Sequence, residues 1–337
     1  DQRKLPHLIE IVTLDNFEQS IIAIRDMYVR GAPLIGVTAA FGFAISMQEN
    51  CSDQAIDETY SRLVAARPTA MNLEWACRIV ATKLKPLPQD SRVETAWQLA
   101  MEMADEDVAT NTRIGKFGVE IIRNIAEKKN DGSPVRILTH CNAGWLATVD
   151  RGTATAPMYE AVEQGIDIEV WVDETRPRNQ GAALTSWELF HNNIPNTLIV
   201  DNAGGHLMQH GKVDVVIVGS DRTTATGDVC NKIGTYLKAL AAADNNVPFY
   251  AALPVSTIDF NIDDGLKIPI EERSENEVLQ MSGMTNKGQM ETISITTEGI
   301  AATNPAFDVT PARYVTGIIT DQGVVAPERQ AIAAIKP

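Results

Sequence analysis

Cys141 and Asp221 are the residues of this sequence best suited to acid–base or nucleophilic chemistry. Each follows a short run rich in apolar residues, VRILTH before Cys141 and DVVIVGS before Asp221. A thiol beside a helix N-terminus can ionise and act as a base or nucleophile. A carboxyl in a closed apolar pocket is kept protonated by desolvation and can act as a general acid. Two plainer interpretations stay open, a buried apolar cysteine and a surface ion pair of Asp221 with Arg222.

Several basic residues stand where an anion could bind. Arg30 opens RGAPLIG and Arg67 opens RPTAMN, each at a glycine- or proline-marked helix start. An arginine there can fork onto a phosphate while helix amides add donors, although an ordinary helix-end ion pair is the alternative. We also expect VCNKIGTYLKAL to be a helix, capped by Asp228 and carrying Asn231 and Lys232 in its first turn. This pattern predicts a phosphate site, with a solvated surface lysine as the alternative.

Metal and nucleotide cofactors are not expected. His140 precedes Cys141, but neighbouring residues near a strand end point to opposite faces, so the two should not pair. The spacing of His206 and His210 lacks the glutamate of a metalloprotease motif, which leaves no metal set. The sequence has neither G-x-G-x-x-G after the first predicted strand nor a G-x-x-x-x-G-K-[ST] loop, so NAD and ATP are disfavoured.

The elements that must position these residues divide into two kinds. From Asn16 to about Lys128 the apolar residues recur at helical spacing, and KKNDGSP then marks a turn. Beyond it, short β-branched runs alternate with helical segments, which predicts a parallel sheet covered on both faces. The strands are expected at 135–139, 168–172, 197–200, 214–219, 248–253 and 314–320. The prediction is an α/β protein with a mainly helical domain at 1–128 and a Rossmann-like domain at 129–337.

Ligands of open parallel sheets gather beyond the carboxyl ends of the strands, at the topological switch point. The loops expected there are HCNAG, DETRPRNQG, DNAGGH, SDRTTATGDVCNK and PVSTID, which are rich in proton donors and acceptors. Cys141 and Asp221 should therefore share one edge of the sheet. They should lie close together if their two strands are neighbours.

The composition of the chain limits which partners and which compartment are plausible. The chain has 337 residues, of which 44% are hydrophobic and 22% charged, as in ordinary globular proteins. A formal net charge of −15 makes a nucleic acid an unfavourable partner. No apolar run approaches the roughly 20 residues that cross a bilayer. Four cysteines without a C-x-x-C pair fit a reduced compartment, so we expect a cytoplasmic protein.

Several long motifs occur in one order along the chain: RGAPLIG, RPTAMNL, THCNAGWLAT, ETRPRNQGAALTSWEL, VGSDRTTATGDVCNKIGTY, IPIEER and NPAFDVTP. With them the sequence resembles the methylthioribose-1-phosphate isomerase family. The resemblance implies a homodimer in methionine salvage that works without a cofactor. It implies Cys141 and Asp221 as the catalytic pair. The substrate-binding positions it implies are Arg30, Gly31, Ala32, Arg67, Gln180, Asn231 and Lys232.

The implied reaction converts 5-methylthioribose 1-phosphate into 5-methylthioribulose 1-phosphate. Phosphate blocks the anomeric oxygen of this sugar, so opening its ring requires an acid, which we expect Asp221 to be. Two alternatives stay open: an isomerase of 5-deoxyribose 1-phosphate or ribose 1,5-bisphosphate, and a non-catalytic regulatory protein of the same fold. Trp145, Thr223 and Thr224 depart from the smaller or more aliphatic residues expected in relatives. The chain begins near the family's DQ-x-x-LP motif, where a short preceding segment is expected.

Overall fold

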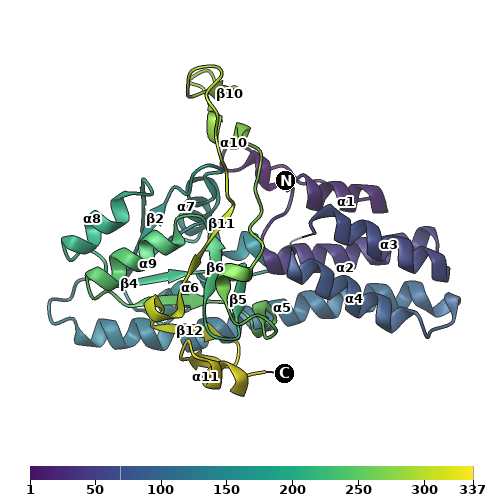
Figure 1. Cartoon of the computed structure of the whole chain (residues 1–337), viewed down its shortest axis with the longest axis horizontal. Helices are drawn as coiled ribbons and strands as arrows, with labels where there is room; N and C mark the ends of the chain where they lie inside the picture. Colours follow the sequence, from purple (N-terminus) through teal and green to yellow (C-terminus); the bar gives the residue numbers. More distant parts are fainter. Residues whose placement is uncertain (69, 337) are drawn as a thin grey trace.

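The N-terminal part of the chain is a set of packed helices. The computed structural model describes residues 1–68 and 70–336 (Figure 1). The first five α-helices are α1 (Phe17–Arg25), α2 (Ala32–Glu49), α3 (Asp53–Ala66), α4 (Met71–Leu84) and α5 (Gln89–Lys128). Local signals start them: the side chain of Asn16 accepts from the amide of Gln19 before α1, and Ser52 accepts from Ala55 before α3. The helical prediction for this part of the chain is confirmed.

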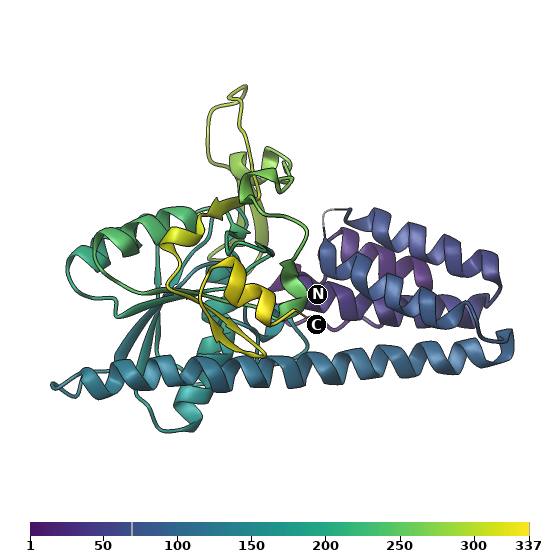
Figure 2. The same ribbon diagram turned by 60° about the horizontal axis from the view of Figure 1, so that its bottom comes forward.

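Helix α5 contributes side chains to two hydrophobic cores. Its first turns supply Ala96 and Ala100 to the core of α1 to α4, and its second half supplies Ile114, Val119 and Ile122 to the core beneath the sheet. Figure 2 shows this helix running along both parts of the molecule. The domain boundary expected after residue 128 thus stays a prediction, because the last helix before it packs on both sides.

The central sheet has seven strands in the order β13-β12-β7-β4-β1-β2-β3. Its members are β1 (Val135–Thr139), β2 (Ile168–Asp173), β3 (Asn196–Ile199), β4 (Val215–Val218), β7 (Phe249–Ala252), β12 (Gly317–Thr320) and β13 (Gly323–Val325). All neighbours pair in parallel except β12 and β13. The six parallel strands follow the 3-2-1-4-5-6 order of a Rossmann-type fold, as predicted.

Both faces of the sheet are covered, which explains why its strands read as continuous apolar runs. Along β4, for example, Val215 and Ile217 join the core on one face, whereas Val216 and Val218 join the core on the other. The first face carries α5, α6 (Ala156–Glu163) and α7 (Ser186–His191). The second carries α8 (Ala203–Gln209), α9 (Thr235–Asp244) and α11 (Arg329–Ala334).

A second, four-stranded sheet corrects one prediction. Residues 229–232 are not helical but form β6 (Val229–Lys232), between β5 (Arg222–Thr224) and β11 (Phe307–Thr310), with β8 (Ile258–Asp259) beyond β5. The helix α9 begins only at Thr235. Asp228 is no helix cap, because its carboxylate accepts from the amides of Gly265 and Ala312. The pairing of β6 with β11 fixes this region as a strand.

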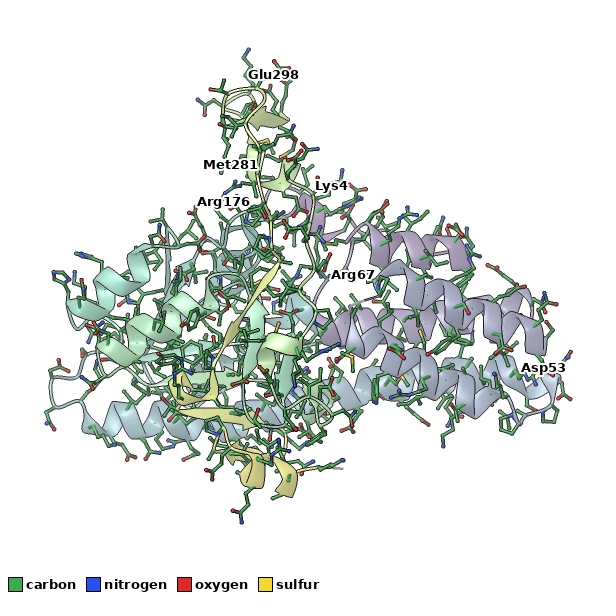
Figure 3. The ribbon with its side chains drawn as sticks, in the orientation of Figure 1. Lys4, Asp53, Arg67, Arg176, Met281 and Glu298 are labelled. Carbon is green, nitrogen blue, oxygen red and sulfur yellow. The ribbon has the colours of Figure 1, made fainter. Side chains whose placement is uncertain are left out.

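A hairpin of β9 (Gln280–Met284) and β10 (Met290–Ser294), preceded by α10 (Asn276–Leu279), projects from the body at the top of Figure 1. The labels of Met281 and Glu298 mark this projection in Figure 3. Across the two described ranges, no helix combines the length and the apolar character needed to span a bilayer.

Candidate active site

One pocket is lined by all nine residues that were predicted as catalytic or substrate-binding. It lies at the carboxyl ends of β1 and β4, where the central sheet meets the N-terminal helices. Its lining includes Arg30, Gly31, Ala32, Arg67, Cys141, Gln180, Asp221, Asn231 and Lys232. Strands β1 and β4 are direct parallel neighbours, with Ile137 opposite Val215. In the 3-2-1-4-5-6 order this is the point where the strand order reverses, so the pocket occupies the expected switch point.

Cys141 is the second residue after β1 and adopts a strained backbone conformation. Its φ of 65° lies in the left-handed region that residues with a side chain rarely adopt. Two threonines hold it there: its amide donates to Oγ1 of Thr175 at 2.8 Å, and its carbonyl accepts from Oγ1 of Thr185 at 2.6 Å. The residue is 7% exposed. Such over-determined strain is typical of a functional position.

Asp221 lies one turn beyond β4 and is suited to hold a proton. Its amide donates to the carbonyl of Cys230 at 2.9 Å, which fixes the backbone. Burial raises the pKa of the carboxyl, and the positive charges of Lys232, Arg30 and Arg67 only partly offset this effect. A buried carboxyl with a raised pKa can act as a general acid.

Arg30 and Lys232 are the cations available to a ligand. Arg30 donates from Nη1 to Oδ1 of Asn142 at 2.5 Å and from Nη2 to the Asn142 carbonyl at 2.8 Å. The ammonium of Lys232 lies 4.6 Å from the ring centroid of Phe307, and burial lowers its pKa. Within residues 1–68 and 70–336, neither Arg30 nor Lys232 forms a salt bridge. Both cationic groups therefore line the pocket without a carboxylate within salt-bridge distance in the described part of the chain.

Arg67 is placed differently from the prediction. It does not open a helix but stands just after α3, where the N-terminal helices meet the rest of the molecule (Figure 3). Its Nη2 atom lies 3.6 Å from Oε2 of Glu271, and Oε1 of Glu271 accepts from Arg273 at 2.8 Å. Burial lowers the pKa of Arg67. The pocket is also lined by Glu271 and Arg273. Both belong to the motif IPIEER, but neither was predicted as a site residue.

Gly31 and Gln180 shape the wall of the pocket. Gly31 has a φ of 98°, and a Cβ there would lie 2.4 Å from the carbonyl oxygen of Ala147, so only glycine fits. Gln180 directly precedes a π-helical turn, η3 (Gly181–Thr185). Turns of this type occur often at functional sites. Asn231 sits on β6, and its Nδ2 donates to Oγ1 of Thr235 at 3.0 Å.

His140 lines the pocket next to Cys141, but both of its ring nitrogens are bonded to other residues, so within the described residues it does not pair with Cys141, as expected. Its Nδ1 atom lies 2.8 Å from Oδ2 of Asp173, and its Nε2 atom lies 2.8 Å from the carbonyl of Ile233. His140, Asp173 and Asp201 have ligand atoms within 4.8 Å of one another. The ammonium of Lys238 already lies 3.1 Å from Asp173 and donates to the carbonyl of Asp201. A cation thus belongs to this cluster, and the absence of a metal stays a prediction.

Comparison with known proteins agrees with this geometry. The profile of the Initiation factor 2 subunit family matches residues 28–327. A protein of Rhizobium meliloti (strain 1021) named methylthioribose-1-phosphate isomerase is 59% identical over all of this chain and 93% of its own length. A protein of the same name from Escherichia coli O45:K1 (strain S88 / ExPEC) is 57% identical over 99% of this chain and 90% of its own length.

Two solved structures share the fold over nearly the whole chain. The 5-methylthioribose 1-phosphate isomerase of Pyrococcus horikoshii OT3 is 40% identical, with a TM-score of 0.85 over 99% of this chain and 91% of that one. The delta subunit of translation initiation factor eIF-2B from A. fulgidus is 38% identical, with a TM-score of 0.81 over 97% and 92%. The family prediction is confirmed: the chain belongs to the Initiation factor 2 subunit family, among relatives named methylthioribose-1-phosphate isomerase.

Proposed function

We propose that this chain is an aldose-ketose isomerase that converts 5-methylthioribose 1-phosphate into 5-methylthioribulose 1-phosphate. One observation carries the proposal: a strained cysteine, Cys141, and a buried acid, Asp221, line one pocket with two cations, Arg30 and Lys232, that form no salt bridge within the described residues. The full-length relatives at 55–59% identity bear the name of this activity. A regulatory scaffold needs neither the strained cysteine nor a buried carboxyl whose pKa is raised.

The phosphate of the substrate is bound by the basic side of the pocket. Arg30 keeps three of its five N–H groups free after bonding Asn142, and Lys232 has an ammonium group without a carboxylate partner in the described part of the chain. A guanidinium and an ammonium together match a phosphate dianion. Holding the phosphate through ring opening and isomerisation fixes the sugar carbons against the two catalytic residues.

Asp221 starts the reaction in this proposal. Its protonated carboxyl gives a proton to the ring oxygen of the sugar as the bond from that oxygen to C1 breaks. The carboxylate that remains later accepts the proton that leaves the C2 hydroxyl as C2 becomes a ketone. Asp221 is thereby regenerated in its acid form, which makes the cycle balanced in protons.

Cys141 acts at the carbon centre. One hydrogen moves from C2 to C1 with Cys141 as the base that relays it or as the group that stabilises the transfer. The 7% exposure of the cysteine keeps this transfer away from bulk water. The residue lines the pocket that also holds Asp221.

The proposal also includes the properties implied by the family resemblance: a homodimer in methionine salvage, located in the cytoplasm and working without a cofactor. Its main competitors are the sister substrates 5-deoxyribose 1-phosphate and ribose 1,5-bisphosphate. The remaining competitor is a regulatory role, which fits the 38% identical initiation factor subunit.

The test is turnover of the purified protein, without added metal or nucleotide, on the three sugar phosphates. Methylthioribose 1-phosphate is expected to give ketose with the highest kcat/KM. Asp221→Asn and Cys141→Ser should each lower kcat by roughly 100-fold or more. Ketose formation by Asp221→Asn at the wild-type rate would sink the assigned role, and no ketose from any substrate would favour the regulatory role.

A matched control separates chemistry from damage to the fold. Cys51 is partly buried at the far end of the N-terminal helices and lies outside the pocket lining. Cys51→Ser makes the same chemical change as Cys141→Ser and should leave kcat and KM unchanged. Thermal unfolding of all the variants checks that lost activity is not lost structure.

A further inference from the structure

A carboxyl lies buried behind the pocket without belonging to its wall. Glu188, on α7, has 0% exposure and is absent from the pocket lining. Its Oε1 atom accepts from Nδ2 of Asn142 at 3.0 Å, and its Oε2 atom accepts from the amide of Leu146 at 3.1 Å. In the described ranges it forms no salt bridge with a lysine or arginine. A buried carboxyl without such a partner is costly, so its two hydrogen bonds need an explanation.

The first hydrogen bond fixes the orientation of an amide. An asparagine side chain can turn either its oxygen or its nitrogen toward a neighbour. When it is ionised, the carboxylate of Glu188 can only accept, so Nδ2 of Asn142 faces it and Oδ1 faces the other way. That other side is occupied by Nη1 of Arg30 at 2.5 Å, which can only donate. The acceptor Glu188 and the donor Arg30 thus demand the same orientation of Asn142.

Arg30 donates two hydrogen bonds to Asn142. Its Nη1 bonds the Asn142 side chain, and its Nη2 bonds the Asn142 main-chain carbonyl at 2.8 Å. These are its only side-chain hydrogen bonds in the chain as described. The plane of the guanidinium is therefore set by Asn142, whose Nδ2 is held by Glu188 at 3.0 Å and by Oγ1 of Thr185 at 3.2 Å. Arg30 itself lines the pocket.

The second hydrogen bond ties the carboxyl to the loop that follows Cys141. A Cβ on Gly144 would lie 1.3 Å from Oε1 of Glu188, so the carboxyl packs directly on the glycine backbone. Its other oxygen holds the amide of Leu146, at the start of the turn whose Ala147 lines the pocket. One buried group thus fixes both the arginine and the loop.

We propose that Glu188 is a positioning residue of the isomerase site, which sets the orientation of the Arg30 guanidinium through the amide of Asn142. This inference rests on the proposed function, in which Arg30 binds the substrate phosphate. It predicts that Glu188 affects the binding of substrate far more than the chemical step. It also predicts that the effect depends on Arg30.

Glu188→Gln tests the chain of contacts with a nearly isosteric change. In wild type, both oxygens of Glu188 accept, from Asn142 and from Leu146. In the variant, one of these oxygens is replaced by an NH2 group, which would face a donor. One hydrogen bond must be lost, or Asn142 must turn and present its Nδ2 to Arg30. Burial raises the pKa of Glu188 to about 8, so the comparison is made at about pH 9, where the wild-type group is ionised.

The measurement is KM for methylthioribose 1-phosphate in a double-mutant cycle with Arg30→Ala. Glu188→Gln should raise KM roughly tenfold and change kcat less than about threefold. In the Arg30→Ala background the same substitution should change KM less than about twofold, because the group it positions is gone. An unchanged KM, or a tenfold rise that persists without Arg30, would overturn the proposal.

Controls keep the result interpretable. Glu127→Gln makes the same change on an exposed part of α5 and should leave KM unchanged. If Glu188→Gln does not fold by thermal unfolding, Asn142→Ser interrupts the same chain at its middle and should raise KM at least tenfold. A wild-type KM for Asn142→Ser would overturn the proposal as well. Absence of ketose from the wild-type protein would instead contradict the proposed function itself.

Discussion

Nη2 of Arg67 lies 3.6 Å from Oε2 of Glu271, so one ion pair joins the N-terminal helices to the segment that follows the central sheet's fifth parallel strand. The Glu271 oxygen is buried and has no hydrogen-bond partner among the described residues. A cation held by a carboxylate at this distance, beside a pocket that is otherwise basic, is only partly satisfied. In the proposed function, the phosphate of the substrate would compete with Glu271 for Arg67.

Removing the competing charge should therefore tighten substrate binding. We expect Glu271→Gln to lower KM about threefold, because the phosphate no longer competes with a carboxylate near Arg67. Arg67→Ala should raise KM at least tenfold. Steady-state kinetics measures both. Glu275→Gln, on an exposed residue of the same segment, is the control, and a higher KM for Glu271→Gln would mean that Glu271 instead holds Arg67 in place.

The same substitution should move the pH profile. Asp221 must be protonated to act as an acid, and its pKa is raised, so kcat/KM falls as the pH rises through that pKa. The charge of Glu271 is one cause of the raised pKa. Glu271→Gln should shift the alkaline fall of kcat/KM to lower pH. The profile of kcat/KM is measured from about pH 5 to pH 10. If Glu271→Gln shows its alkaline fall at the same pH as wild type, Asp221 is not the acid.

Gly31 should not tolerate a side chain. Its φ of 98° and the 2.4 Å approach to the Ala147 carbonyl predict that Gly31→Ala costs roughly 2–4 kcal/mol in the free energy of unfolding, with loss of activity. Gly132 also has a positive φ, 68°, but has nothing within 4 Å of a Cβ. Gly132→Ala should cost only about 1 kcal/mol. Urea unfolding measures both, and equal costs would refute the steric explanation.

Asp107 should make stability depend on pH. Its carboxylate accepts from the amide of Val149 at 2.7 Å and from Asn111 at 3.1 Å, yet burial raises its pKa to about 6. A folded pKa above the unfolded value of 3.8 means that the folded state binds the proton more tightly. The contribution of Asp107 to stability is present at low pH and is lost as the pH rises from about 4 to 6.

Asp107→Asn removes this contribution to the pH dependence. As the pH rises from about 4 to 6, the wild type should lose up to about 3 kcal/mol of its free energy of unfolding relative to Asp107→Asn. Urea unfolding at several pH values measures it. A difference that is constant between about pH 4 and pH 7 would show that Asp107 has an ordinary pKa.

The sheet and the pocket could be predicted from the sequence because they depend on local patterns. Each strand of the parallel sheet is a short apolar run, and the polar residues that follow them meet at one edge whatever the details of the packing. The neighbouring positions of Cys141 and Asp221 follow from this rule once β1 and β4 are adjacent. The roles of the nine nominated residues came from the family resemblance.

The errors came from contacts between distant segments. Residues 229–232 were predicted as the start of the helix VCNKIGTYLKAL, but their pairing with Phe307–Thr310, more than 70 residues away, makes them a strand. Asp228 consequently bonds Gly265 and Ala312 instead of capping a helix. Glu188 gave no signal, because a glutamate in a short helix is ordinarily exposed. Only its position behind Asn142 reveals it.

The continuous course of α5 has a consequence for how the molecule unfolds. Forty residues at 1.5 Å each make a rod of about 60 Å, whose two ends are buried in different cores. A fragment that begins at residue 129 would leave the sheet without Ile114, Val119 and Ile122. Because one continuous helix contributes side chains to both cores, we expect the two parts to lose their structure in one cooperative transition.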